Sequence, residues 1–170
     1  TQNLKFGEAV KHLAQLAGMQ TYIFSKQDEE REKKWNEYQS IYSQYVEFYH
    51  KELLKNENYS VARDYLKKRS LGKDEVKKFK IGYIEKNPNI FSELKKNYSE
   101  QTLIETGLFY FDEKKKTCVE RFRGRLIFPI NNISGQPIAL GGRIIENKDY
   151  LAKYINSPET IFFKKGSNLY

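Results

Sequence analysis

Apolar residues recur at helical spacing through the first third of the chain. Between residues 6 and 18 they fall at steps of three and four, and Gly18 stands where such a helix would end. Between residues 26 and 57 aromatic side chains recur at the same steps among charged ones, which predicts one long helix with an aromatic stripe. The stripe consists of Trp35, Tyr38, Tyr42, Tyr45 and Tyr49. It favours a surface packed into the core over one that stacks on bases or binds a partner.

Shorter helices and then strands are predicted further along the chain. The helical pattern returns over residues 61–69, 73–79, 90–97 and 100–105, with Ser60 and Ser99 as N-caps. From Leu108 onward, short apolar runs alternate with turn residues, which is typical of strands. The order of elements predicts an α+β domain: a helical N-terminal part with the long aromatic-striped helix, followed by a small mixed β-sheet region.

A β-hairpin is predicted between residues 126 and 143. The apolar run 126–130 is typical of a buried strand, in which Pro129 indicates a sheet edge or a strand end. Turn residues follow at 131–136, and a second run at 137–140 leads into Gly141-Gly142-Arg143. Paired glycines let a neighbour or a ligand approach the backbone closely, so this hairpin would deliver Arg143 to a binding surface. A tight turn that carries a solvated arginine fits the same residues.

Positive charge is concentrated late in the chain. The 170 residues carry a formal net charge of +8. Residues 1–59 hold 8 Lys or Arg against 9 Asp or Glu, whereas residues 60–170 hold 22 against 13, a net of +9. This asymmetry is expected of a nucleic-acid-binding domain, although an anionic membrane surface or an acidic protein would also attract it. Lys114, Lys115 and Lys116 are interpreted as an exposed turn only.

Composition excludes several other classes of protein. No apolar stretch approaches the roughly 20 residues of a membrane span, and no signal pattern is visible, so a cytoplasmic location is the default. Cys118 is the single cysteine and cannot form an internal disulfide, so it is expected to be a small packing residue. His12 and His50 do not form a zinc-ligand spacing with it. The residues assemble no nucleophile–base pair and no phosphate-cradling loop, so no catalytic residue is predicted.

Basic and aromatic residues are interleaved near the end of the chain. If residues 121–125 are extended, Arg121, Arg123 and Arg125 point to one face, because strand side chains alternate. Lys153 is followed by Tyr154, a combination in which the cation can neutralise a phosphate and the ring can stack on a base. A Lys-Tyr pair beside a turn is also common as surface and partial core.

Several strings in this region resemble one protein family. They are RFRGRLIFPI at 121–130, GGR at 141–143, KYINSPET at 153–160 and FKKG at 163–166, preceded by ARDYLKKRSLGKDEVKKFKIGY at 62–83. In order and spacing they resemble the N-terminal basic subdomain of the RNA polymerase domain, the catalytic core, of bacterial DnaG-type DNA primases. The resemblance runs from about residue 61 to residue 170, and KYINSPET is its most specific string.

The resemblance implies a place in a longer protein. Primases of this type carry a zinc-binding module, this basic subdomain, a Toprim subdomain with the catalytic metals, and a helicase-binding domain. Residues 1–25 would then be the end of the zinc-module helix and a linker, and residues 26–170 the basic subdomain. We expect an excised domain without the Toprim subdomain or the zinc-binding module, inactive by itself. No cofactor is expected in this fragment; the family enzyme uses Mg or Mn in the Toprim part and zinc in the N-terminal module.

The resemblance also implies a function and a set of binding residues. The enzyme would be a template-dependent RNA polymerase that makes short RNA primers in DNA replication. This part would guide single-stranded DNA template and the RNA–DNA hybrid toward the Toprim metals; nucleoside triphosphates and, through the absent C-terminal domain, the replicative helicase are the other partners. The implied nucleic-acid-binding residues are Arg69, Arg121, Arg123, Arg125, Arg143, Lys153, Tyr154, Asn156, Lys164 and Lys165. Asn156 would bond a base, a sugar or the loop backbone.

The chain departs from the family pattern at a few positions. Ser70 stands where the family commonly has Gly, Ile161 where it has Pro, and Lys164 where it has His, so the phosphate contact could fall on Lys164 or Lys165. Ser167 replaces a usual basic residue. Two functions of another class stay open: a non-enzymatic single-stranded nucleic-acid-binding module, and a protein interaction module built on the aromatic helix.

Overall fold

The computed structural model describes residues 6–19, 25–146 and 151–168, which form two compact units, Thr1–Glu37 and Tyr38–Tyr170. In the first unit, α1 (Phe6–Leu16) is the helix expected there, and Gly18 follows it with a φ of +65° that favours glycine. The long helix α2 (Lys26–Lys55) begins in the first unit and ends in the second. The predicted long helix is therefore confirmed within two residues at its C-terminal end.

Short helices connect α2 to the strands, as predicted. They are η1 (Glu57–Tyr59), α3 (Ser60–Lys67), α4 (Lys73–Lys78), α5 (Ile90–Leu94) and α6 (Glu100–Glu105), and α7 (Lys165–Asn168) comes after the last strand. Ser99 caps α6 as expected, because its Oγ accepts a hydrogen bond of 3.0 Å from the backbone N–H of Thr102. The predicted cap at Ser60 is wrong. Because η1 runs directly into α3, Tyr59 holds the cap position and Ser60 is already helical.

The strands form one four-stranded sheet and one hairpin. The sheet has the order β1 (Gly82–Ile84), β4 (Arg125–Asn131), β5 (Pro137–Ile144) and β6 (Tyr154–Asn156), and β2 (Phe109–Asp112) pairs with β3 (Thr117–Glu120). The α+β class is confirmed, but every pairing in the described part of the chain is antiparallel, where a mixed sheet was expected. Strand β1 was not predicted, because three residues are too short for an alternating pattern.

The predicted hairpin is β4 and β5, closed by the turn at 131–136. Asn132 holds this turn, since its Oδ1 accepts hydrogen bonds from the N–H groups of Ser134 and Gln136. Pro129 lies inside β4, beyond the three residues that pair with β1, so the strand is locally an edge at the proline. The two glycines at 141 and 142 also lie within β5. The alternative of a tight turn with a solvated arginine is therefore wrong.

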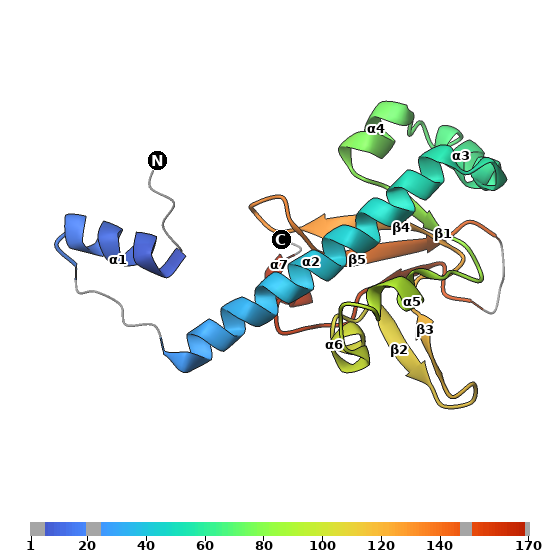
Figure 1. Ribbon diagram of the computed structural model, residues 1–170. Helices are drawn as coiled ribbons and strands as arrows, with labels where there is room; N and C mark the ends of the chain where they lie inside the picture. The colour runs from blue at the N-terminus through green and yellow to red at the C-terminus, as the bar shows by residue number, and fades with distance from the viewer. Residues whose placement is uncertain (1–5, 20–24, 147–150, 169–170) are drawn as a thin grey trace. The chain divides into compact units, whose positions relative to one another are not determined.

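Helix α2 lies against one face of the four-stranded sheet (Figure 1). At Gly82 of β1 an added methyl carbon would come within 3.0 Å of the backbone of Tyr49, so only glycine lets the helix approach this closely. Tyr42, Tyr45 and Tyr49 are nearly or wholly buried there with apolar residues of the sheet. From Tyr38 to Tyr49 the aromatic stripe is therefore core, as predicted, whereas Trp35 is only partly buried. A second cluster, around Leu53, Leu66, Val76 and Leu126, joins the end of α2 to α3, α4 and the sheet.

Candidate nucleic-acid interface

Cross-strand register places the late cations on defined faces of the sheet. Leu126, Arg143 and Tyr154 are direct neighbours across β4, β5 and β6, so their side chains share one face. The intervening residues Ile127 and Ile155 belong to the cluster packed with α2. Arg143 and Tyr154 consequently lie on the face of the sheet opposite Tyr42, Tyr45 and Tyr49 of α2.

Arginine and tyrosine side chains alternate along this face. The Arg143 Cζ lies 4.7 Å from the ring centroid of Tyr154 and 5.3 Å from that of Tyr65, which comes from α3. The Arg69 Cζ lies 5.6 Å from the same Tyr65 ring. All three distances are within the range of cation–π attraction. We call Arg69, Tyr65, Arg143 and Tyr154 the Arg–Tyr row.

Aromatic rings rather than carboxylates hold Arg143. Among the ion pairs of the described residues, none involves Arg143, and its Nε is buried without a hydrogen-bond partner. An arginine stacked between two rings leaves its terminal N–H groups available to a phosphate. The outer ring is accessible, since Tyr154 is 60% exposed. The row therefore combines a fixed cation with a ring on which a base can stack.

Asn156 and Gly141 lie beside the row. Asn156 pairs with Gly141 across β5 and β6, so both lie on the same face as Arg143. Asn156 is exposed, and Gly141 has no side chain to cover the adjacent backbone. The other glycine serves the opposite face: at Gly142 a methyl carbon would lie 2.5 Å from Phe122 Cδ1, inside the core. The pair thus has one structural glycine and one that leaves the open face unobstructed.

The three arginines at 121–125 do not point to one face, so that prediction is wrong. Residues 121–124 form a turn, in which Gly124 has a φ of +72° and donates to the Ile84 carbonyl. Arg121 lies with its Cζ 5.4 Å from the Tyr110 ring centroid, and Arg123 donates a hydrogen bond of 3.2 Å to the Tyr110 hydroxyl. Two guanidinium groups therefore gather around Tyr110 of β2, away from the third.

Arg125 is the third arginine, and it belongs to the core. It is only 6% exposed, and its Nη1 donates to the Lys153 carbonyl at 3.4 Å. Burial lowers the pKa of its guanidinium from the ordinary value, although an arginine stays charged. Its position braces the segment that leads into β6 rather than offering a charge to a ligand.

The lysines of the predicted site lie at the start of the KYINSPET segment and a few residues after its end. Lys153 is exposed immediately before β6, and Lys164 and Lys165 are exposed at the start of α7. The middle of the segment is structural: the Ser157 Oγ accepts from the Leu140 N–H at 2.9 Å, and the Ser157 N–H donates to the Leu140 carbonyl at 2.8 Å. These bonds fix the path of the chain from β6 toward Lys164 and Lys165.

Sequence reasoning missed the two tyrosines that organise the arginines. Tyr65 and Arg69 are four residues apart in a helix that was predicted, a spacing that places them on one helix face. That spacing could have indicated the pairing. Tyr110 offered no comparable signal, because its contacts with Arg121 and Arg123 cross between separate segments.

Nowhere in the described ranges do three or more His, Cys, Asp or Glu side chains come together as ligands for a metal ion. Helices long and apolar enough to cross a membrane are likewise not found among the residues described. The structure therefore assigns no metal ligand to this part of the chain.

Known proteins resemble this chain over most of its length. Residues 48–170 match the family described as the DNA primase catalytic core, N-terminal domain. A DNA primase of Clostridium acetobutylicum is 37% identical over 100% of this chain, which spans only 28% of that protein. The structure of a DnaG primase catalytic domain bound to ssDNA has 30% identity and a TM-score of 0.71, covering 80% of this chain and 42% of that one. The Aquifex aeolicus primase, with its zinc-binding and RNA polymerase domains, has 29% identity and a TM-score of 0.67, covering 98% of this chain and 39% of that one.

Proposed function

The chain belongs to the bacterial DnaG-type DNA primases as part of their catalytic core, and on that premise we propose that its open sheet face binds single-stranded DNA template. The main support for this proposal is the Arg–Tyr row, in which Arg143 is stacked between Tyr65 and the exposed ring of Tyr154. Phosphates would bind Arg143 and Arg69, and a base would stack on Tyr154. Lys153 and Lys165 would extend the cationic path along the KYINSPET segment.

Within the whole enzyme, this surface acts by positioning. It holds the template, and then the short RNA–DNA hybrid, against a Toprim subdomain whose carboxylates bind the catalytic Mg or Mn. Phosphoryl transfer of this kind depends on alignment of the reacting groups more than on covalent chemistry by the protein. The described residues offer no ligand cluster for those metals or for zinc, so every step assigned to this chain is one of binding and orientation.

The same proposal extends to the remaining partners. The product is a short RNA primer made in the bacterial cytoplasm from nucleoside triphosphates, and the replicative helicase binds elsewhere in the enzyme. Arg121 and Arg123, gathered around Tyr110, would act either as phosphate ligands or as braces near the incoming nucleotide. Residues 1–25 are assigned to the end of the preceding zinc module and its linker. Asn156 is assigned a hydrogen bond to a base or sugar, because it is exposed beside the row.

The interaction module built on α2 loses its basis in this fold. Tyr38, Tyr42 and Tyr45 are 3%, 1% and 0% exposed, so they offer no surface to a partner. A non-enzymatic binding module would use the same open face. A primase needs an acidic metal-binding segment after Tyr170, whereas a non-enzymatic module does not. The complete coding sequence therefore distinguishes the two functions.

Fluorescence anisotropy with single-stranded DNA over a salt series tests the proposed surface. Replacing Arg143, Lys153 and Lys165 together with Ala is expected to lower the log–log salt slope by roughly 2, at about 0.7 per phosphate. Tyr154→Ala is expected to weaken binding by about 1–3 kcal/mol with little change in slope, because it removes stacking rather than charge.

A matched control removes equal charge elsewhere. Lys114, Lys115 and Lys116 lie exposed in the β2–β3 turn, and their replacement by Ala also removes three charges. This control should leave the slope close to that of the wild type. If both triple variants lower the slope equally, only net charge matters and the open face is not the binding surface.

A further inference from the structure

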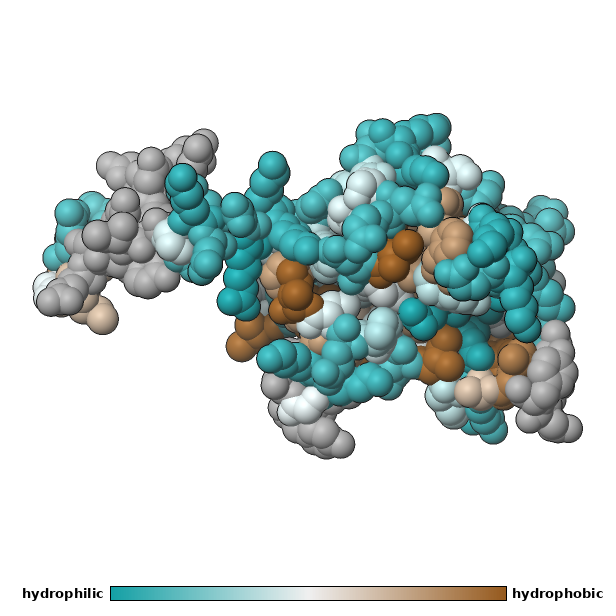
Figure 2. All heavy atoms as spheres, turned by 90° about the horizontal axis from the view of Figure 1, so that it is seen from below, coloured by the Kyte–Doolittle hydropathy of each residue, from teal (hydrophilic) through white to brown (hydrophobic). Residues whose placement is uncertain are grey.

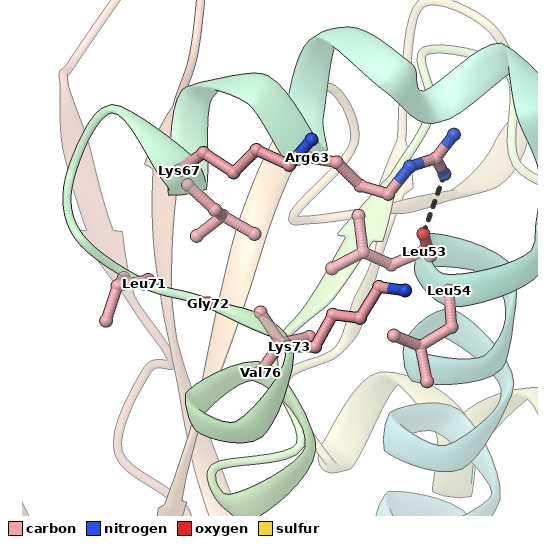
Figure 3. A pocket seen from close by; sticks show the side chains of 9 residues that line it. Leu53, Leu54, Arg63, Lys67, Leu71, Gly72, Lys73 and Val76 are labelled. Atoms are coloured by element: carbon pink, nitrogen blue, oxygen red, sulfur yellow. Dashed lines mark hydrogen bonds between the residues drawn. The ribbon is translucent and has the colours of Figure 1, made fainter.

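An apolar pocket of about 200 Å³ opens between the end of α2, α3 and α4 (Figure 3). Its walls are aliphatic and belong to the second core cluster: Leu53, Leu54, Leu66, Leu71 and Val76. The residues of the Arg–Tyr row and of the KYINSPET segment do not line it. The pocket is therefore separate from the surface proposed to bind DNA.

The rim of this pocket is cationic. Arg63, Lys67 and Lys73 line it, and its nine lining residues include no carboxylate. The Arg63 guanidinium is held in place, because it donates to the carbonyl groups of Leu53 at 2.9 Å and Asn56 at 2.7 Å. Lys67 forms a 3.6 Å ion pair with Asp64, and both side chains are more than half exposed. In Figure 3 the Lys73 side chain extends from α4 toward Leu53 and Leu54.

The size of the pocket limits what it can hold. Apolar cavities of about 150 Å³ bind benzene, so this one accommodates a single large side chain, whereas drug-sized ligands need roughly 300–1,000 Å³. A nucleic-acid base is disfavoured, since the aliphatic walls offer neither an aromatic face nor partners for its polar edges. Positive charge at the rim favours carboxylates next to the inserted group.

The face of the molecule drawn in Figure 2 contrasts with this pocket. Figure 2 shows that face as mostly hydrophilic, with its hydrophobic side chains in small separate patches rather than one broad apolar surface. The pocket between α2, α3 and α4 differs, because its apolar residues surround a hollow.

We propose that this pocket docks an acidic peptide segment of a partner protein. The segment inserts one phenylalanine or leucine side chain and places carboxylates beside Lys67 and Lys73.

Methyl NMR of the 170-residue chain tests the proposal. The probe is the peptide acetyl-Asp-Glu-Phe-Glu-Asp-amide, and two control peptides replace its Phe with Ser or its four acids with the matching amides. The Phe peptide should shift the methyl resonances of the aliphatic wall saturably, and each control peptide should bind about tenfold more weakly. Replacing Lys67 and Lys73 together with Glu should weaken binding by a similar factor.

Two further variants separate this site from the DNA surface and from general charge effects. Lys68→Glu, exposed on the same segment but outside the lining, should bind like the wild type. The triple Ala variant at 143, 153 and 165 should also retain peptide binding, so the outcome does not depend on the proposed function. The proposal is overturned if the wall methyl groups do not shift saturably, if the Ser peptide binds equally well, or if Lys68→Glu weakens binding as much as the double variant.

Discussion

At the scale of single residues, Glu120 is the least expected feature of the core. Its Oε2 accepts hydrogen bonds from the hydroxyls of Tyr45 at 2.9 Å and Tyr49 at 2.6 Å, while its Oε1 is buried without a partner among the described residues. Burial raises the pKa of this carboxyl to about 7, the two tyrosines oppose the rise, and Glu85 adds to it. The carboxyl group connects β3 to α2 through these hydrogen bonds, but its ionisation in the buried site lowers the free energy of unfolding.

The raised pKa predicts a pH-dependent stability. The unfolded chain ionises Glu120 near its ordinary pKa of 4.5, and the folded chain only near 7, so stability falls as the pH rises between these values. Glu120→Gln removes this loss and should gain stability relative to the wild type, on the order of 2–3 kcal/mol, between pH 4.5 and pH 8. Urea denaturation at both pH values measures the change.

The matched control for this measurement is Glu113→Gln, which lies exposed in the β2–β3 turn. It should show no comparable change with pH. A Glu120→Gln variant whose stability relative to the wild type is the same at both pH values would rule out ionisation of the buried carboxyl as the cause.

At the scale of elements, the position of Arg143 on the open sheet face depends on one helix. Helix α3 supplies Tyr65, whose ring lies between Arg69 and Arg143 and so joins the helix to β5. The Tyr65 hydroxyl is buried without a hydrogen-bond partner among the described residues, so the ring itself makes the contact. Tyr65 is thus a positioning residue that orients Arg143 for the template.

Replacing this ring should weaken DNA binding through Arg143. Tyr65→Leu keeps an apolar side chain but removes the cation–π contacts, and affinity for single-stranded DNA should fall roughly three- to tenfold. Tyr65→Phe keeps the ring and should bind like the wild type. In a double-mutant cycle by anisotropy, Tyr65→Leu should add little to Arg143→Ala. Independent, additive losses would instead mean that Tyr65 does not act through Arg143.

At the scale of the whole molecule, binding capacity follows the charge. Residues 60–170 carry a net of +9, and residues 1–59 a net of −1. The strands and short helices that form the Arg–Tyr row all lie within the unit Tyr38–Tyr170. DNA binding is therefore expected to reside in that unit.

Deleting residues 1–25 tests this expectation. The deleted part contains only Lys5, Lys11 and Glu8 as charged residues, so the salt slope for single-stranded DNA should be unchanged and the affinity within about twofold. The triple Ala variant at 143, 153 and 165 should lower the slope of the shortened chain by the same amount as in the full chain. A slope reduced by the deletion alone would place part of the binding surface before residue 26.

The sequence by itself determined the features that arise from local pattern or composition. The aromatic helix, the α6 cap at Ser99, the β4–β5 hairpin and the concentration of charge all follow from residues close together in the chain, and they were predicted from it. The family resemblance was visible for the same reason, since its motifs are continuous strings. The short strand β1 left no such pattern and was missed.

Only the tertiary structure decided which charged groups act together. A turn at Gly124 separated Arg121 and Arg123 from Arg125, which became part of the core. The approach of α3 to the sheet recruited Tyr65 to Arg143, and the packing of β3 under α2 buried Glu120. These outcomes depend on cross-strand register and on contacts between distant segments, because the environment of a charge is set by whatever the fold brings beside it.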